Sequence, residues 1–122
     1  MILHITSRGE WEEALSRGTH SPSSLASEGF IHCSTITQAL SSANKHFRGR
    51  KGLVLLSIEE RLLTSPLKYE LPPSAADDRI ESLFPHIHGP LNVEAVTKVV
   101  DFPCEPDGTF RFPAALADES EV

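Results

Sequence analysis

Histidines within strand-like apolar segments are the residues of this chain whose types and spacing could do chemistry. Six histidines occur among 122 residues, and four of them lie in such segments: His4, His32, His86 and His88. The three segments are 2–5, 29–34 and 83–91. Imidazole titrates near neutral pH, and the neutral ring ligates metals and hydrogen-bonds hydroxyl groups. The pattern therefore predicts a cleft in which several of these rings meet.

A metal site is the first chemistry that this pattern allows. His86 and His88 are two residues apart, so on an extended segment both rings point to the same side. Two histidines and a third ligand suit zinc with an open position. His32, Glu70 or Glu81 could supply that ligand, but the spacing selects none of them. The competing interpretation is one structural and one surface histidine on a loop bounded by prolines, and no metal is expected.

Two histidine–hydroxyl pairs, His4-Ile5-Thr6 and His32-Cys33-Ser34, allow a second chemistry. Two-histidine phosphodiesterases use such pairs, with each histidine as acid or base and each hydroxyl on phosphate. That class draws its two motifs from two similar halves of a longer chain. The pairs lie too close together here, and the chain is too short for both halves, so this interpretation is not favoured.

Cys33 allows a third chemistry, attack by a thiolate. It neighbours His32, but adjacent residues of a strand point to opposite faces, so these two cannot pair. His4 or His86 could serve as the base instead. A cysteine on a strand is more often a small buried hydrophobic residue, which is the favoured interpretation.

A nucleotide- or sugar-binding cleft is the fourth possibility and the favoured one. His4 and His32 each lie on a predicted strand that leads directly into a helix, and His32 and Ser34 share one strand face. Such groups hydrogen-bond ribose hydroxyls, and an aromatic ring such as that of Tyr69 stacks on a flat ligand. Glu70 could stabilise an oxocarbenium-like transition state when an N-glycosidic bond breaks. The chain has no glycine-rich phosphate loop, which excludes a Rossmann or P-loop site.

Composition limits the class of protein. The chain is 39% apolar and 23% charged, which fits one globular domain with its own core. A net charge of −6 argues against nucleic acid as partner, and the basic residues Arg48, Arg50 and Lys51 are interpreted as a solvated turn. No apolar run approaches the roughly 20 residues that span a bilayer, and no signal-peptide pattern opens the chain. With two cysteines and no expected disulfide, a cytoplasmic protein is predicted.

Hydrophobic periodicity and capping residues predict the elements that position these side chains. Strands are expected at 2–5, 29–34, 53–58, 67–71 and 93–102, with 53–58 in the centre because both of its faces are apolar. Helices are expected after capping boxes at Ser7 and Thr35, ending at Gly18 and near Gly49. Residues 19–28 are expected to form a loop. Residues 77–92 are expected to begin with a brief helix and to continue as an ordered loop up to Asn92. Residues 1–113 form one predicted α+β domain, and 114–122 form an acidic tail.

The chain resembles a known family at two motifs. Gly29-Phe30-Ile31-His32-Cys33-Ser34 and Leu83-Phe84-Pro85-His86-Ile87-His88-Gly89-Pro90-Leu91, together with His4, are similar to the hallmark segments of domain of unknown function 952. The resemblance covers residues 1 to about 102. The family pattern usually has tyrosine where this chain has His88.

That family resembles the ADP-ribosyltransferase fold, a compact split β-sandwich with flanking helices that binds NAD between its two sheets. The resemblance implies that His4 hydrogen-bonds the NAD ribose and that His32 and Ser34 line the nicotinamide side. The third catalytic position is then Glu70, which would stabilise positive charge on the ribose carbon, or His86, as acid, base or hydroxyl anchor. The implied cofactor contacts are His4, Phe30, His32, Ser34, Tyr69 and His88.

The predicted function is binding of NAD or a related small-molecule nucleotide, with ADP-ribosyl transfer or N-glycosidic cleavage as the reactions that such a site would serve. The alternatives are a non-catalytic module that binds a ligand or a protein, and a histidine metal site. NAD is the expected cofactor, and neither nucleic acid nor membrane is an expected partner.

Overall fold

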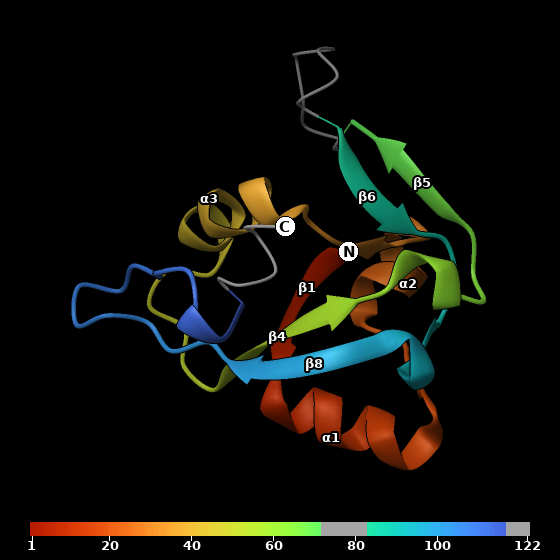
Figure 1. Cartoon of the computed structure of the whole chain (residues 1–122), viewed down its shortest axis with the longest axis horizontal. Helices are drawn as coiled ribbons and strands as arrows, with labels where there is room; N and C mark the ends of the chain where they lie inside the picture. Colours follow the sequence, from red (N-terminus) through yellow and green to blue (C-terminus); the bar gives the residue numbers. More distant parts are fainter. Residues whose placement is uncertain (72–82, 117–122) are drawn as a thin grey trace.

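Three antiparallel sheets form the strand framework of residues 1–71 and 83–116, the part of the chain that this computed structural model describes (Figure 1). The first sheet has the order β1-β4-β8, formed by Ile2–Ser7, Leu53–Ile58 and Val96–Asp101. The second has the order β3-β6-β5, formed by Ile31–His32, Phe84–Ile87 and Leu67–Glu70. The third pairs β2 (Thr19–His20) with β7 (Leu91–Asn92).

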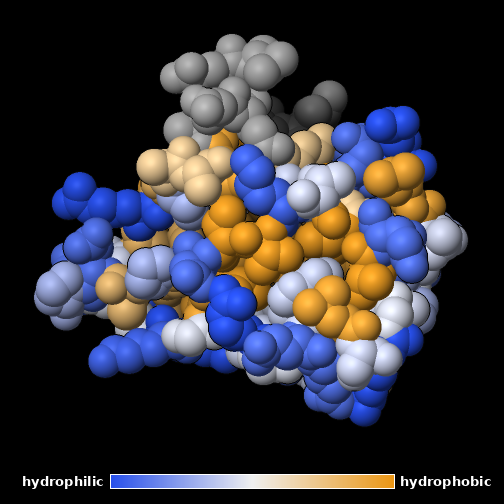
Figure 2. All heavy atoms as spheres, turned by 60° about the horizontal axis from the view of Figure 1, so that its bottom comes forward, coloured by the Kyte–Doolittle hydropathy of each residue, from blue (hydrophilic) through white to orange (hydrophobic). Residues whose placement is uncertain are grey.

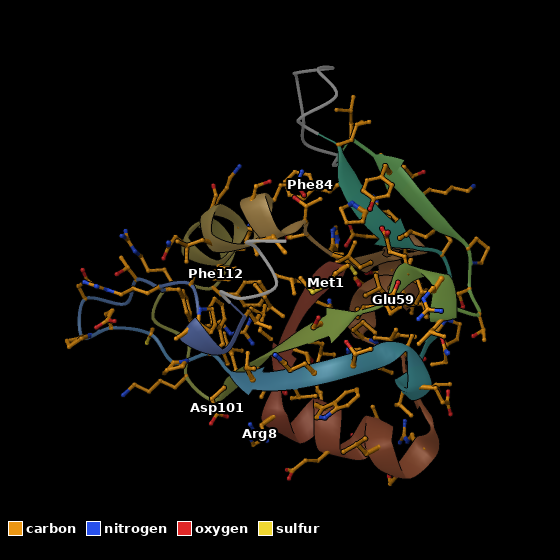
Figure 3. All side chains as sticks on the ribbon, in the orientation of Figure 1. Met1, Arg8, Glu59, Phe84, Asp101 and Phe112 are labelled. Atoms are coloured by element: carbon orange, nitrogen blue, oxygen red, sulfur yellow. The ribbon has the colours of Figure 1, made fainter. Side chains whose placement is uncertain are left out.

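The helices are α1 (Arg8–Arg17), α2 (Ser23–Glu28) and α3 (Ile36–His46), with short 3-10 turns at η1 (Glu60–Leu62), η3 (Val93–Ala95) and η4 (Ala114–Leu116). Helices α1 and α3 pack on the first sheet, and α2 contacts β3 of the second. α1 and α3 lie on opposite sides of the β1-β4-β8 sheet (Figure 1). An ion pair between Arg8 and Asp101 joins the start of α1 to the end of β8 (Figure 3).

β4 divides the apolar core into two clusters because every residue of this central strand is buried. Its side chains alternate between the two faces of the sheet. Val54 and Leu56 pack with Trp11 of α1 in one cluster, whereas Leu53 and Leu55 pack with α3 in the other. The continuous apolar run therefore forms the predicted central strand.

The predicted helix starts are confirmed. The Ser7 hydroxyl accepts the Glu10 N–H at 3.1 Å, and the Thr35 N–H donates to the Gln38 side chain at 3.0 Å. Gly18 ends α1 with φ of 86°, a left-handed conformation that glycine adopts without steric cost. These local signals were sufficient because they act within one turn of chain.

Residues 19–28 are not the loop that the sequence predicted. They contain β2 and α2. α2 has six residues and no buried side chain, so it lacks the apolar stripe by which a helix is recognised in a sequence. β2 has two residues and is defined by its pairing with β7, which a local pattern cannot reveal.

The stretch from Leu83 to Asn92 is likewise not a loop. It contains β7 and also β6, the central strand of its sheet. Pro85 lies in the stretch predicted as a loop, and proline has no N–H to donate to a ladder. Its carbonyl accepts the Cys33 N–H at 3.1 Å, at the point where β3 has just ended, so its missing N–H breaks no ladder bond. The helix predicted near residue 77 lies outside the described residues.

The packed part of the chain continues past residue 113, where the predicted domain ended. Leu116 of η4 is fully buried with Leu3 and Phe102 in the second cluster. Phe110, also buried in this cluster, forms an isolated bridge with Cys104. Residues 117–122 of the predicted acidic tail lie outside the described part.

The predicted class, a mixed α+β domain, is confirmed, and the split β-sandwich stays a prediction. Figure 2, from the side of α1 and β8, shows hydrophobic residues gathered in the middle of this face and hydrophilic ones around them. Among the described residues, no helix has the length and apolarity that crossing a bilayer requires.

Candidate functional site

A cleft of about 700 Å³ runs along the outer edge of β1, which is an edge strand of its sheet. At this edge Leu3 and Ser34 exchange two backbone hydrogen bonds of 2.8 Å. Beyond them the cleft opens between residues of α2 and α3. Phe84, the first residue of β6, also belongs to the lining (Figure 3). The polar lining includes His4, Glu10, Glu28, His32, Ser34, Lys45, Arg50 and His86.

The backbone N–H and C=O of Ile5 point to the same edge as the cleft. In an antiparallel strand both groups of one residue point to one edge, and residues two apart share that edge. Leu3 uses this edge to bond Ser34, so Ile5 presents its own N–H and C=O there, and Ile5 lines the cleft. No hydrogen bond joins them to another described residue. The cleft therefore offers a ligand an adjacent donor and acceptor.

His4 lies in the cleft wall with both ring nitrogens engaged. Its Nδ1–H donates to the His32 carbonyl at 2.7 Å. Burial, and then nearby His20, lower the pKa of His4 to about 4, so at neutral pH its Nε2 carries a lone pair. This atom accepts the Nε2–H of His20 at 3.1 Å. A ligand hydroxyl reaches His4 Nε2 only by replacing His20.

His32 is an exposed imidazole of the cleft. Its side chain is 47% exposed, and Nε2 bonds the Glu28 carboxylate at 2.9 Å. Glu28 ends α2, and Gly29 then turns the chain into β3 with φ of 88°. Ser34 is buried in the same wall. The cleft thus combines a hydroxyl, an imidazole and a carboxylate within one short stretch of chain.

His86 is the buried imidazole of the cleft wall, 1% exposed. Its Nδ1–H donates to Glu70 Oε1 at 2.9 Å, because a carboxylate only accepts. Phe30 stacks on the ring with centroids 4.0 Å apart. Burial lowers the pKa of His86, so the ring is neutral and Nε2 carries a lone pair. This buried Nε2 has no partner among the described residues, and a ligand donor could supply one.

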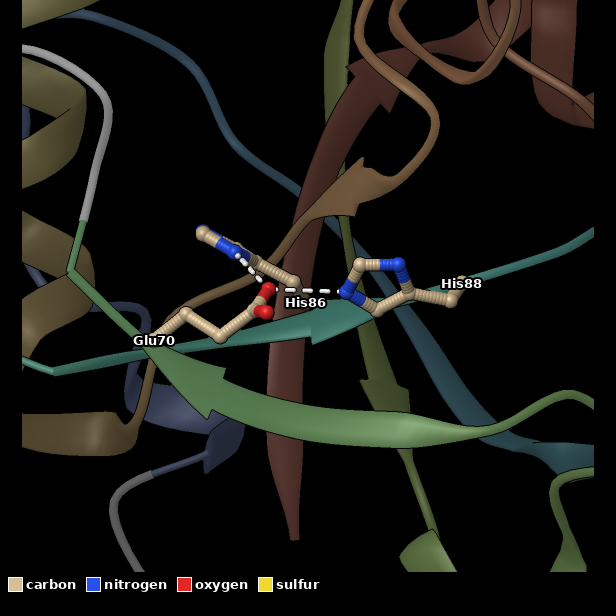
Figure 4. A group of neighbouring side chains, drawn as sticks. All are labelled: Glu70, His86 and His88. Carbon is tan, nitrogen blue, oxygen red and sulfur yellow. Dashed lines mark hydrogen bonds and ion pairs between the residues drawn. The ribbon is translucent and has the colours of Figure 1, made fainter.

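Glu70 does not belong to the cleft lining. It lies on β5, where Oε1 also accepts the Nε2–H of His88 at 2.7 Å (Figure 4). The hydrogen bonds from His88 and then His86 lower the pKa of Glu70, which keeps it ionised. Glu70 is therefore placed to orient His86, and His86 rather than Glu70 lines the cleft.

Three predicted ligand contacts lie outside the lining: Phe30, Tyr69 and His88. Phe30 covers the His86 ring instead. Tyr69 alternates with Glu70 along β5, so it points to the opposite face, where it is 46% exposed and donates its hydroxyl to Glu60. His88 belongs to the Glu70 cluster. His4, His32, Ser34 and His86 are the predicted residues that the structure brings together.

Cys33 has the environment of a structural residue. It is 4% exposed within the apolar cluster beneath β3. Burial raises the pKa of its thiol far above neutral pH, so the thiolate that nucleophilic attack requires is not formed. This placement agrees with the favoured interpretation of Cys33 as a small buried hydrophobic residue.

Several polar residues of the site were not predicted to belong to it, among them Glu10, His20, Glu28, Lys45 and Arg50. Arg50 was interpreted as part of a solvated turn, but it lines the cleft with its guanidinium 5.1 Å from the Phe47 ring. Lys45 lies in the last turn of α3. Neither residue belongs to a motif, and only the packing of α3 beside β1 brings them to the cleft.

The fold and the cleft define a class, a small mixed α+β domain with antiparallel sheets and a histidine-lined cleft along a strand edge. The family described as protein of unknown function (DUF952) matches residues 5–99, and the chain belongs to this family. The predicted family is thereby confirmed.

Solved structures of protein CC0527 from Caulobacter crescentus are similar to this chain. The crystal structure is 36% identical with a TM-score of 0.78, and the match covers 99% of this chain and 98% of that one. The solution NMR structure is 38% identical with a TM-score of 0.72, over 97% and 94%. The comparison with curated proteins found no match.

Proposed function

We propose that the cleft along β1 binds NAD or a related nucleotide. The observation that carries this proposal is that the unpaired N–H and C=O of Ile5 lie in the same 700 Å³ cleft as the imidazoles of His4, His32 and His86. Cavities of roughly 300–1,000 Å³ with a few convergent polar groups are typical of small-molecule sites.

The edge of β1 suits a flat ring that carries a hydrogen-bond donor beside an acceptor. The carboxamide of nicotinamide and the amino edge of adenine both have this pattern, and either could pair with Ile5 as a neighbouring strand would. Phe84 supplies apolar area in the lining. The buried Nε2 of His86 has no partner among the described residues, and a ligand donor that reaches it would supply one. These groups support recognition of the base.

The remaining parts of a dinucleotide also have matching groups. Ser34 and His32 can bond ribose hydroxyls, and His4 can do so when the hydroxyl replaces His20. Lys45 and Arg50 supply positive charge for a diphosphate, which a chain of net charge −6 would otherwise repel.

The reaction that we propose for this cleft is transfer at the N-glycosidic bond. The bond from C1′ of the ribose to nicotinamide breaks, its electron pair leaves with nicotinamide, and water or another acceptor attacks C1′ and gives up a proton. Glu28, which lines the cleft beside His32, is the carboxylate that we assign to stabilise the oxocarbenium-like state and to take that proton. Glu70 acts through His86.

Calorimetric titration of NAD, ADP-ribose and nicotinamide tests binding. NAD and ADP-ribose are expected to bind more tightly than nicotinamide, because only they reach Lys45 and Arg50. Arg50→Gln should weaken NAD binding about tenfold, whereas Lys51→Gln, a neighbouring change outside the lining, should leave it unchanged. Absence of NAD binding by the wild type, or equal effects of the two changes, would overturn the proposal.

Release of nicotinamide from bound NAD, followed by chromatography, separates an enzyme from a binding module. The wild type is expected to release nicotinamide. Glu28→Gln is expected to bind NAD but to release nicotinamide at least about a hundredfold more slowly. NAD that stays intact on the wild type would favour the non-catalytic module and end the assignment of a reaction.

A further inference from the structure

Glu70, His86 and His88 form a compact cluster on one face of the β3-β6-β5 sheet. His86 and His88 are two residues apart at the end of β6, so both rings extend from the same face. Glu70 lies on the adjacent strand β5 and reaches both rings (Figure 4). Glu70 and His86 thus lie on two hydrogen-bonded strands, and His88 directly follows β6, where its backbone N–H donates to the Pro66 carbonyl at 2.8 Å.

The ligand atoms of this cluster are at nearly the spacing of a metal site. Glu70 Oε1 is 2.9 Å from His86 Nδ1 and 2.7 Å from His88 Nε2, and all three atoms lie within 4.8 Å of one another. Zinc bonds to nitrogen and oxygen are about 2.0–2.1 Å long, which separates tetrahedral ligand atoms by about 3.3 Å. Small rotations of the Glu70 and His88 side chains are enough to admit an ion.

The cluster also combines a fixed ring with access from solvent. His86 is 1% exposed and held by Phe30 at 4.0 Å, so binding costs little further ordering of this ring. The side chains of His88 and Glu70 are 26% and 37% exposed, which leaves a path for an ion and room for water as a further ligand. Of the described residues, these three alone form such a group of potential metal ligands.

We propose that Glu70, His86 and His88 bind a divalent first-row transition-metal ion, for which Zn²⁺ is the first probe. Two imidazoles and one carboxylate are a ligand set for zinc or ferrous iron with open coordination positions. The site is separate from the nucleotide cleft except at His86, because Glu70 and His88 do not line that cleft.

Metal binding changes the cleft through the His86 tautomer. Without metal, Nδ1–H donates to Glu70 and Nε2 has the lone pair. With a metal on Nδ1, the proton must reside on Nε2, so the atom that the cleft could use changes from acceptor to donor. His88 would bind the ion through Nε2, the atom that now donates to Glu70. The ion would therefore alter which ligand group His86 prefers.

Zinc titration of EDTA-treated, dialysed full-length protein tests the site. The wild type is expected to bind one equivalent of Zn²⁺ by calorimetry, with a rise in melting temperature that EDTA reverses. His88→Gln and Glu70→Gln keep polar side chains at these positions but remove good ligands, and each should weaken binding more than tenfold. His46→Gln, an exposed histidine on α3, controls for the loss of any imidazole.

Two spectroscopic measurements test the ligands directly. Imidazole ¹⁵N spectra of the wild type should show the His86 proton move from Nδ1 to Nε2 when Zn²⁺ is added. Co²⁺ in place of Zn²⁺ should give visible ligand-field bands that His88→Gln lacks. A wild type that takes up less than one equivalent of Zn²⁺, or a His88→Gln protein that binds it as tightly, overturns the proposal. Either result would leave the proposal of NAD binding standing, because His88 does not line the cleft.

Discussion

Glu70 Oε1 accepts the Nδ1–H of His86 at 2.9 Å, and this one contact fixes what His86 can do. Because the carboxylate holds the proton on Nδ1, the lone pair of the neutral ring resides on Nε2. The sequence offered Glu70 and His86 as rivals for one catalytic position. In the structure the two residues are hydrogen-bonded to each other, and only His86 lies in the cleft wall.

Glu70→Ala should destabilise the fold by about 1–3 kcal/mol, since it leaves the buried Nδ1–H of His86 without its acceptor. Unfolding in urea measures this loss. Glu59→Ala is the matched control, because Glu59 pairs with Arg61 at 3.7 Å on the surface and should cost no more than about 0.5 kcal/mol. Equal losses in both variants would mean that the contact between Glu70 and His86 stabilises the fold no more than a surface ion pair does.

Parts of this fold could be predicted wherever the signal is local. The apolar run of β4 and the amphipathic stripe of α3 were visible in the sequence because burial repeats with the period of the element. α2 and β2 were not, since α2 buries no side chain and β2 exists only through its pairing with β7. The strand around Pro85 was also predicted as a loop, because a proline is tolerated there only on account of where β3 ends.

The site divides in the same way. His32 and Ser34 could be placed together because residues two apart share a strand face. His20 was missed because its partner, His4, is a tertiary contact. That Glu70 faces His86 rather than a ligand depends on the register of β5 against β6, which no single-sequence pattern supplies.

Stability should fall in mild acid because of His4. Its pKa is about 4 in the folded protein against 6.5 when unfolded, so between these values the unfolded chain binds more protons. The free energy of unfolding is therefore full above pH 6.5 and declines toward pH 4, by about 3 kcal/mol for this group. His4→Gln, which keeps a donor for the His32 carbonyl, should flatten this slope in urea unfolding at several pH values. A slope unchanged by the substitution would contradict the buried, neutral state of His4.

Alkylation should distinguish the two cysteines. Cys33 is buried and its thiol pKa is raised by burial, whereas Cys104 is partly exposed. Iodoacetamide should therefore modify Cys104 in the folded protein and leave Cys33 intact, with both modified in urea, as peptide mass spectrometry can show. Rapid modification of Cys33 under native conditions would reopen the possibility of a thiolate nucleophile.

Leu116 should be the residue that sets how much of the C-terminal segment the fold requires. Its side chain is 0% exposed and packs with Leu3, Phe102 and Phe110, although the sequence around it reads as the start of a tail. Leu116→Ala removes buried methyl groups and leaves a cavity, at a cost of about 2–5 kcal/mol. A chain shortened to residue 113, which lacks η4, should lose at least as much stability as Leu116→Ala. If the chain ending at 113 were as stable as the wild type, the domain would end where composition alone placed its boundary.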